Sequence, residues 1–233
     1  MKNKDILLKL SYLLFPNRCA VCNKVINMHN YYCHTCFLEL RPIPNYFATL
    51  YASSNTFITY FKKPYFDGIC APFYHSDGSK QMVYNYKFYN RSEIKHILTD
   101  EMANSFNKYL KDKEINCICE VPTKLISIIK RGYNHTALLS KLLSIKCDIP
   151  RYKLIKQIGK KSVQHKLKAA ERLKNVKGVF GFNNKFNIKG KNVVIVDDIF
   201  STGATLNECS KVLKKNGANK VYILTATINR FGD

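Results

Sequence analysis

A short apolar run that is followed at once by two carboxylates constrains this chain more than any other feature. Residues Val193–Val196 are all β-branched, which is typical of a strand buried on both faces. Asp197 and Asp198 come next, and a short loop then leads into residues 206–215, whose apolar side chains have helical spacing. A strand, a loop and a helix in this order predict the carboxyl edge of an open α/β sheet, which is where such sheets bind ligands.

The loop after the acids has the composition of a phosphate-binding site. A helix N-terminus offers free backbone N–H groups and the positive end of the helix dipole. Gly203 lets the backbone approach a ligand closely, and the hydroxyls of Ser201, Thr202 and Thr205 can donate to phosphate oxygens. Carboxylates next to a phosphate are repulsive unless they accept hydrogen bonds from sugar hydroxyls or bind a divalent cation. The stretch therefore predicts a ribose phosphate ligand, with the side chains of Asp198 and Thr202 at the surface of a strand-end crevice.

Charge gives an independent indication of a partner. The 233 residues include 38 Lys and Arg against 16 Asp and Glu, a formal charge of +22, which indicates nucleic acid or an acidic membrane surface. Residues 121–191 hold 18 of the basic residues and only two acids, so few i,i+4 ion pairs can relieve the repulsion. A solvated helix face is the alternative, but we favour a nucleic acid backbone as the partner. The candidate DNA-binding residues are Lys160, Lys161, Lys166, Lys168, Arg172 and Lys174.

Two closely spaced cysteine pairs predict a structural metal site. Cys19 and Cys22 form one C-x-x-C turn, and Cys33 and Cys36 form the second. Two such turns can supply four thiolates to a tetrahedral Zn²⁺. His29 or His34 could replace one of these ligands, and a redox dithiol is the alternative for either pair alone.

The remaining segments suggest one α/β domain behind this small module. We expect residues 1–44 to form an N-terminal amphipathic helix and the zinc module, and residues 45–233 to form a domain of alternating strands and helices around a parallel sheet. No run of about 18 apolar residues occurs, so we expect no membrane span and a cytoplasmic protein. Lys80–Phe88 has helical spacing, and the aromatic residues near its end either stack on bases or pack in the core. They are Tyr84, Tyr86, Phe88 and Tyr89.

The stretch from the strand to the loop resembles the phosphoribosyl-pyrophosphate (PRPP) motif of type I phosphoribosyltransferases. The resemblance implies that Asp197 and Asp198 contact the ribose 2′ and 3′ hydroxyls. It assigns the 5′-phosphate to the loop Ser201, Thr202, Gly203, Ala204 and Thr205, and it implies Mg²⁺ with PRPP or a ribose 5-phosphate ligand. A carboxylate that only caps a helix is the alternative, but capping accounts for one acid and not for two.

The order of motifs along the whole chain resembles the ComF family of competence proteins. Paired cysteines come first, then a Val121–Pro122 turn, the Arg131–Asn134 segment and the PRPP-type loop. The chain departs from the family at Lys130, where an acid is common, and at His135, where Gln is usual. The resemblance implies a zinc module fused to a phosphoribosyltransferase-like domain, with a pyrophosphate loop that includes Pro122, Thr123, Lys124 and Arg131.

The same resemblance implies a role in natural transformation, in which incoming single-stranded DNA is handled in the cytoplasm. Single-stranded DNA, PRPP and other transformation proteins, such as a DNA-translocating helicase, are the expected partners. The alternative is an active phosphoribosyltransferase that transfers ribose 5-phosphate to an unidentified acceptor. No hood for an acceptor base is recognisable in the sequence.

Overall fold

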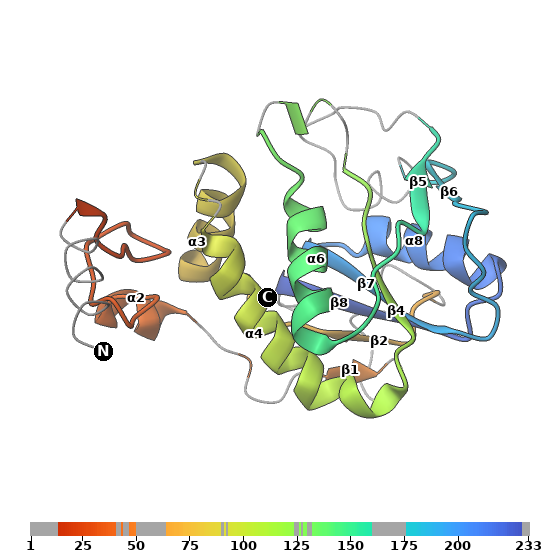
Figure 1. The fold of residues 1–233 in the computed structure, drawn as a ribbon, viewed down its shortest axis with the longest axis horizontal. Coiled ribbons are helices and arrows are strands. Elements are labelled where there is room, and N and C mark those ends of the chain that lie inside the picture. Colours follow the sequence, from red (N-terminus) through yellow and green to blue (C-terminus); the bar gives the residue numbers. More distant parts are fainter. Residues whose placement is uncertain are drawn as a thin grey trace, which may run out of the picture.

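A mostly parallel sheet lies between two layers of helices in the computed structural model of the chain (Figure 1). The structure describes residues 14–40, 43, 47–49, 64–89, 91, 93–123, 126, 128–129, 132–159 and 176–229. The predicted amphipathic helix at the N-terminus falls almost entirely outside these residues. Among the helices that are described, none has both the length and the apolar character needed to cross a bilayer.

The six-stranded sheet has the order β1-β2-β8-β7-β4, and β3 pairs with β8 just beyond β2. Only β1 is antiparallel to its neighbour. The strands are β1 (Phe47–Thr49), β2 (Gly68–Cys70), β3 (Phe73–Tyr74), β4 (Cys117–Glu120), β7 (Asn192–Phe200) and β8 (Lys220–Ile228). A separate antiparallel pair consists of β5 (Ile155–Gln157) and β6 (Phe180–Phe182).

The central strand β7 is longer than the apolar run that predicts it. The run ends at Val196, but Asp197 pairs with Thr225 of β8, and the ladder continues to Phe200. Both acids therefore lie within the strand and not in the loop that follows it. A nine-residue partner strand provides this register, which the local sequence of β7 does not reveal.

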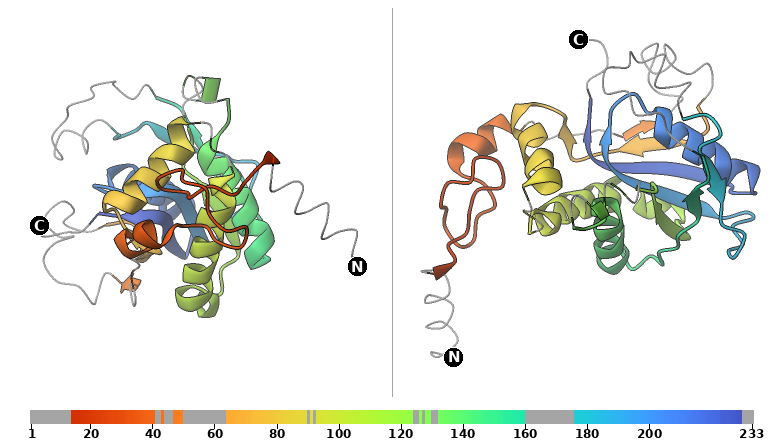
Figure 2. Two further views of the ribbon diagram at one scale, coloured as in Figure 1. Left: turned by 90° about the vertical axis from the view of Figure 1, so that its left-hand side faces the viewer. Right: turned by 90° about the horizontal axis from the view of Figure 1, so that it is seen from above.

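Helices cover both faces of the sheet, as Figure 2 shows. The helices are α2 (His34–Glu39), α3 (Asp77–Phe88), α4 (Ile94–Tyr109), α6 (His135–Cys147) and α8 (Ala204–Lys215), with a 3₁₀ turn η1 (Lys111–Lys113). Val194 and Val196 belong to the core under α3, α4 and α6, whereas Val193 and Ile195 belong to the core under α8. The side chains of β7 thus alternate between two separate cores. The predicted α/β fold class is confirmed.

Helix α3 begins three residues earlier than predicted because Ser76 and Ser79 form a capping box. The helix lies between the four-cysteine module and the sheet (Figures 1 and 2). The buried Asn85 amide donates to the carbonyls of Ala20 and Val21, at 2.9 and 2.8 Å. The module is therefore tied to α3 through backbone groups, while the boundary at residue 44 stays a prediction.

Candidate functional site

The four-cysteine module is a compact loop that ends in helix α2. The backbone N–H of Cys19 donates to the Lys24 carbonyl at 2.8 Å, which closes the first turn. Cys33 is the N-cap residue of α2, and its backbone N–H donates to the Sγ of Cys19 at 3.4 Å. Burial acts to raise the pKa of the Cys19 thiol, but backbone N–H groups of Cys22 and Cys33 outweigh it and lower that pKa to about 7. The loop thus favours a thiolate at Cys19, the form that binds metal.

The four sulfur atoms have the separation that a tetrahedral metal needs. They all lie within 4.8 Å of one another, and all four residues are free cysteines. The Sγ atoms of Cys22 and Cys33 are 3.7 Å apart. A Zn–S bond of about 2.3 Å places two sulfurs of a regular tetrahedron roughly 3.8 Å apart. The site therefore fits Zn²⁺ with Cys19, Cys22, Cys33 and Cys36 as ligands, and the cluster includes neither His29 nor His34.

A second set of polar side chains gathers at the carboxyl edge of the sheet. Strands β3, β4, β7 and β8 are mutually parallel, so their carboxyl ends meet at one edge. Thr123 follows β4, Asp198 lies near the end of β7, Thr227 near the end of β8, and His75 follows β3. The Nδ1 of His75 is 3.0 Å from the Thr227 hydroxyl. The edge thus combines residues from four strands that are distant in the sequence.

Asp198 is the centre of this edge. Its Oδ2 lies 2.7 Å from the Lys87 Nζ of α3 and 2.8 Å from the His135 Nε2 of α6. Burial alone would raise the pKa of Asp198, but the Lys87 charge and the His135 hydrogen bond hold it well below its ordinary value. The carboxylate is therefore ionised and joins β7 to the two helices that cover this face.

The prediction that Asp198 lies at the surface of the crevice is wrong. The residue is only 4% exposed, because β7 continues through it and directs its side chain under α3 and α6. Asp197 is half-buried, and its Oδ1 accepts from the backbone N–H of Asp198 at 2.9 Å. One carboxylate oxygen of Asp197 lies within 4.8 Å of ligand atoms of both Asp198 and His135, so the three side chains together could hold a cation. The two acids of the motif thus have different environments.

The loop from Ser201 to Thr205 leads from β7 into α8. Gly203 is the N-cap residue of α8 with φ of +72°, a left-handed conformation that favours glycine. A Cβ at Gly203 would lie 2.4 Å from Cζ of Phe200, so no larger residue fits without a shift. Ser201 and Thr202 are partly exposed, and the Thr202 hydroxyl accepts from the Ala204 backbone N–H at 3.4 Å.

The predicted pyrophosphate loop is described only in part. The Thr123 hydroxyl lies 3.1 Å from Asn134 Oδ1 and 3.0 Å from the Thr136 hydroxyl, so the segment after β4 is held at the N-terminus of α6. Pro122 precedes it at the same strand end. Lys124, Arg131 and the six candidate DNA-binding residues lie outside the residues that the structure describes.

Sequence reasoning missed Lys87, His75 and His135 as neighbours of the motif. Lys87 lies among the aromatic residues of the predicted helix Lys80–Phe88, and His135 stands out in the sequence only as a departure from the family pattern. Each precedes Asp198 by more than 60 residues, and nothing in the local sequence indicates the contacts. The sequence offers one signal for the Lys87 contact: Lys87 is a polar residue next to the buried aromatic Tyr86 on a predicted helix.

Comparison with known families agrees with this geometry. The family model for the phosphoribosyl transferase domain matches residues 90–230, which include β4, β7, the loop and β8. The match extends over more than half of the chain. The chain therefore belongs to the phosphoribosyl transferase domain family.

Three relatives show more narrowly which kind of phosphoribosyl transferase domain protein this chain resembles. Competence protein F of Haemophilus influenzae is 27% identical over 210 residues, which cover 88% of this chain and 87% of that protein. Competence protein ComFC of Bacillus subtilis is 27% identical over 61% of this chain and 56% of its own length. DNA utilization protein YhgH of Escherichia coli O157:H7 is 28% identical over 61% of this chain and 63% of its own length. With the four-cysteine cluster, these relatives identify the chain as a ComF family protein.

We predict that the purified protein carries about one zinc ion per chain. Cys33→Ser removes one of four thiolates, so it should release most of the metal and unfold the module. Metal analysis of freshly prepared protein provides the measurement. Cys147→Ser, outside the cluster, is the matched control and should retain the metal. A metal-free parent protein would overturn the assignment.

We also predict that Asp198→Asn destabilises the domain, because the nearly buried Lys87 ammonium then has no counter-ion there. Breaking a buried ion pair typically costs about 3 kcal/mol, and Asp197→Asn should cost much less. Denaturant unfolding measures both variants. The double variant Lys87→Met with Asp198→Asn should regain part of the loss, and equal effects of the two single variants would contradict the prediction.

Proposed function

We propose that this protein binds single-stranded DNA in the cytoplasm during natural transformation, and that it also binds a phosphoribosyl ligand at the carboxyl edge of its sheet. The proposal of a phosphoribosyl ligand rests on the left-handed backbone conformation of Gly203 at the start of α8, in the loop that follows the two acids of β7. The names of the relatives support the DNA half, since two are competence proteins and the third is a DNA utilization protein.

The electrostatics of the edge suit a ribose phosphate. Lys87 neutralises Asp198, which leaves Asp197 as the more accessible carboxylate of the pair. In the proposal, Asp197 accepts hydrogen bonds from ribose hydroxyls or holds Mg²⁺, which prefers oxygen ligands. The backbone N–H groups at the start of α8 and the Thr202 hydroxyl receive the 5′-phosphate. PRPP has all of these groups, and so do other ribose 5-phosphate ligands.

The DNA half of the proposal rests on charge. Residues 121–191 carry most of the net charge of +22, and Lys160, Lys161, Lys166, Lys168, Arg172 and Lys174 form its densest part. Such a segment neutralises phosphates on binding and releases their counter-ions. The zinc module is stabilised by its metal and is available to contact a transformation protein such as a helicase.

An active phosphoribosyltransferase is the second candidate. Thr123 lies at the end of β4, directly next to β7, where a pyrophosphate group would lie beside the ribose site. Transfer requires an acceptor and the release of pyrophosphate. Detection of pyrophosphate from PRPP in the presence of DNA or free nucleobases would favour this candidate over simple binding.

We predict that calorimetry detects binding of PRPP with Mg²⁺ to the parent protein. Thr202→Ala should weaken this binding about tenfold or more, because a hydrogen bond to a charged group is worth about 1.5–3 kcal/mol. Asp197→Asn should weaken it as well. Asn219→Ala, at the opposite edge of the sheet, is the control and should bind normally. If no phosphoribosyl ligand binds the parent protein, this half of the proposal fails.

We predict further that the affinity for single-stranded DNA falls with salt, with a slope in log–log form of about −0.7 per phosphate contacted. Replacing Lys160, Lys161, Lys166 and Lys168 together by Gln should weaken binding and flatten the slope. Asp197→Asn should leave the slope unchanged, because it removes no phosphate contact. Titrations of labelled oligonucleotide at several salt concentrations provide the test, and a four-Lys variant with the parent slope would refute the assignment.

A further inference from the structure

Three aromatic side chains form an exposed ridge at the end of α3. Tyr84, Phe88 and Tyr89 are 46%, 55% and 62% exposed, whereas Tyr86 is fully buried in the core and cannot stack on a ligand. The Tyr84 ring centroid lies 4.8 Å from that of Phe88 and 5.5 Å from that of Tyr89. Contiguous exposed apolar groups of this kind usually mark an interaction site.

The position of the ridge follows from helix geometry. Successive residues of an α-helix are separated by about 100° around its axis, so residues 84–88 sample every side of α3. Tyr86 faces the core, the Asn85 amide binds the carbonyls of the zinc module, and Lys87 reaches Asp198. Tyr84 and Phe88 share the remaining, outward side. The ridge therefore lies between the zinc module on one flank and the ribose-phosphate site on the other.

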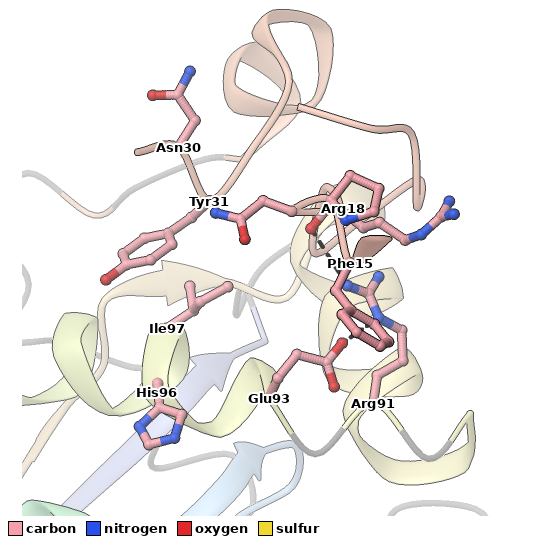
Figure 3. Close-up of a pocket in the computed structure, with 10 residues that line it drawn as sticks. Phe15, Arg18, Asn30, Tyr31, Arg91, Glu93, His96 and Ile97 are labelled. Carbon is pink, nitrogen blue, oxygen red and sulfur yellow. Dashed lines mark hydrogen bonds and ion pairs between the residues drawn. The ribbon is translucent and has the colours of Figure 1, made fainter. Parts of the chain in front are cut away.

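One exposed cation lies near the ridge, and the guanidinium of a second basic residue is bound within the protein. Lys80, one turn before Tyr84, is exposed. Arg91, two residues after Tyr89, lines a pocket of about 350 Å³ between the zinc module and the start of α4 (Figure 3). Phe15, Arg18, Tyr31 and His96 also line this pocket. Glu93 is the acid among its lining residues, and it accepts a hydrogen bond from Arg91 at 2.7 Å. Arg91 also donates to the carbonyls of Cys19 and Arg18, at 2.9 and 3.3 Å, so its guanidinium holds the four-cysteine module and is not offered to a ligand.

We infer that the Tyr84–Phe88–Tyr89 ridge is a base-stacking platform for single-stranded nucleic acid that passes from the zinc module toward the ribose-phosphate site. The inference rests on the proposed DNA binding and adds where and how the bases are held. Exposed rings beside the exposed Lys80, on a chain of net charge +22, suit a single strand, because its bases stack on the rings while its phosphates contact the positive charge. A second copy of the chain is a poor occupant, since two molecules of charge +22 repel each other.

A fluorescence experiment can test the stacking directly, because the chain contains no tryptophan. Phe88→Trp introduces a single indole on the ridge. Adding oligo-dT should quench its emission strongly, whereas an abasic oligonucleotide of equal length should quench it little. Tyr65→Trp is the matched control, because Tyr65 is also exposed but lies beside Lys211 of α8, on the opposite face of the sheet. If oligo-dT binds, as anisotropy of a labelled oligonucleotide would show, and the Phe88→Trp emission does not change, the inference is wrong.

An affinity experiment separates this inference from the proposed function. Tyr84→Ser with Phe88→Ser should lower the affinity for oligo-dT at least about tenfold, with the salt slope unchanged, because stacking is not an ionic contact. Its affinity for the abasic oligonucleotide should equal that of the parent protein, and circular dichroism checks that the variant is folded. Failure of the parent protein to bind any DNA would remove the proposed function itself. If the double variant binds oligo-dT normally, the ridge assignment is wrong while the proposed DNA binding stands. The same holds if the substitutions change the oligomeric state and leave oligo-dT binding unchanged.

Discussion

The contact of Asp198 with Lys87 and His135 is the interaction on which the arrangement of the site depends. It joins the central strand to α3 and α6, the two helices that cover the carboxyl edge. A carboxylate that is 4% exposed is costly unless its charge is compensated, so the packing of both helices is coupled to this residue. The hydroxyl of Tyr86, next to Lys87, donates to the His135 carbonyl at 2.7 Å and links the two helices directly.

Neutralisation of one acid also explains how the motif can accept a phosphate. A free carboxylate about 6 Å from a phosphate opposes it by roughly 3 kcal/mol per unit charge at an effective dielectric of about 20. Two free acids would double this repulsion. With Asp198 paired internally, a ligand meets mainly Asp197, whose charge the ribose hydroxyls or Mg²⁺ can compensate. The two adjacent acids therefore differ in role under the proposed function: Asp198 holds α3 and α6, and Asp197 is the acid that would meet the ligand.

The sequence predicted what depends on local pattern. The β-branched run of β7, the helix α8 and the spacing of the four cysteines each carry their own signal, and each is found as expected. The burial of Asp198 could not be predicted, because it depends on the long pairing of β7 with β8 and on helices more than 60 residues away. The burial of the four aromatic residues of α3 could not be predicted for the same reason. The sequence identifies them as a group, but only the orientation of α3 shows that Tyr86 is buried and its three neighbours are exposed.

The same helix connects all of the functional features that the structure describes. Asn85 holds the zinc module through two buried carbonyls, Lys87 holds Asp198, and the side between them presents the aromatic ridge. Because these residues share little more than one helical turn, a shift of the zinc module on α3 also moves the ammonium that neutralises Asp198. A metal bound by the four cysteines would therefore stabilise more than a small module. Through Asn85 it would hold the orientation of α3, and with it the position of the aromatic ridge relative to Asp198.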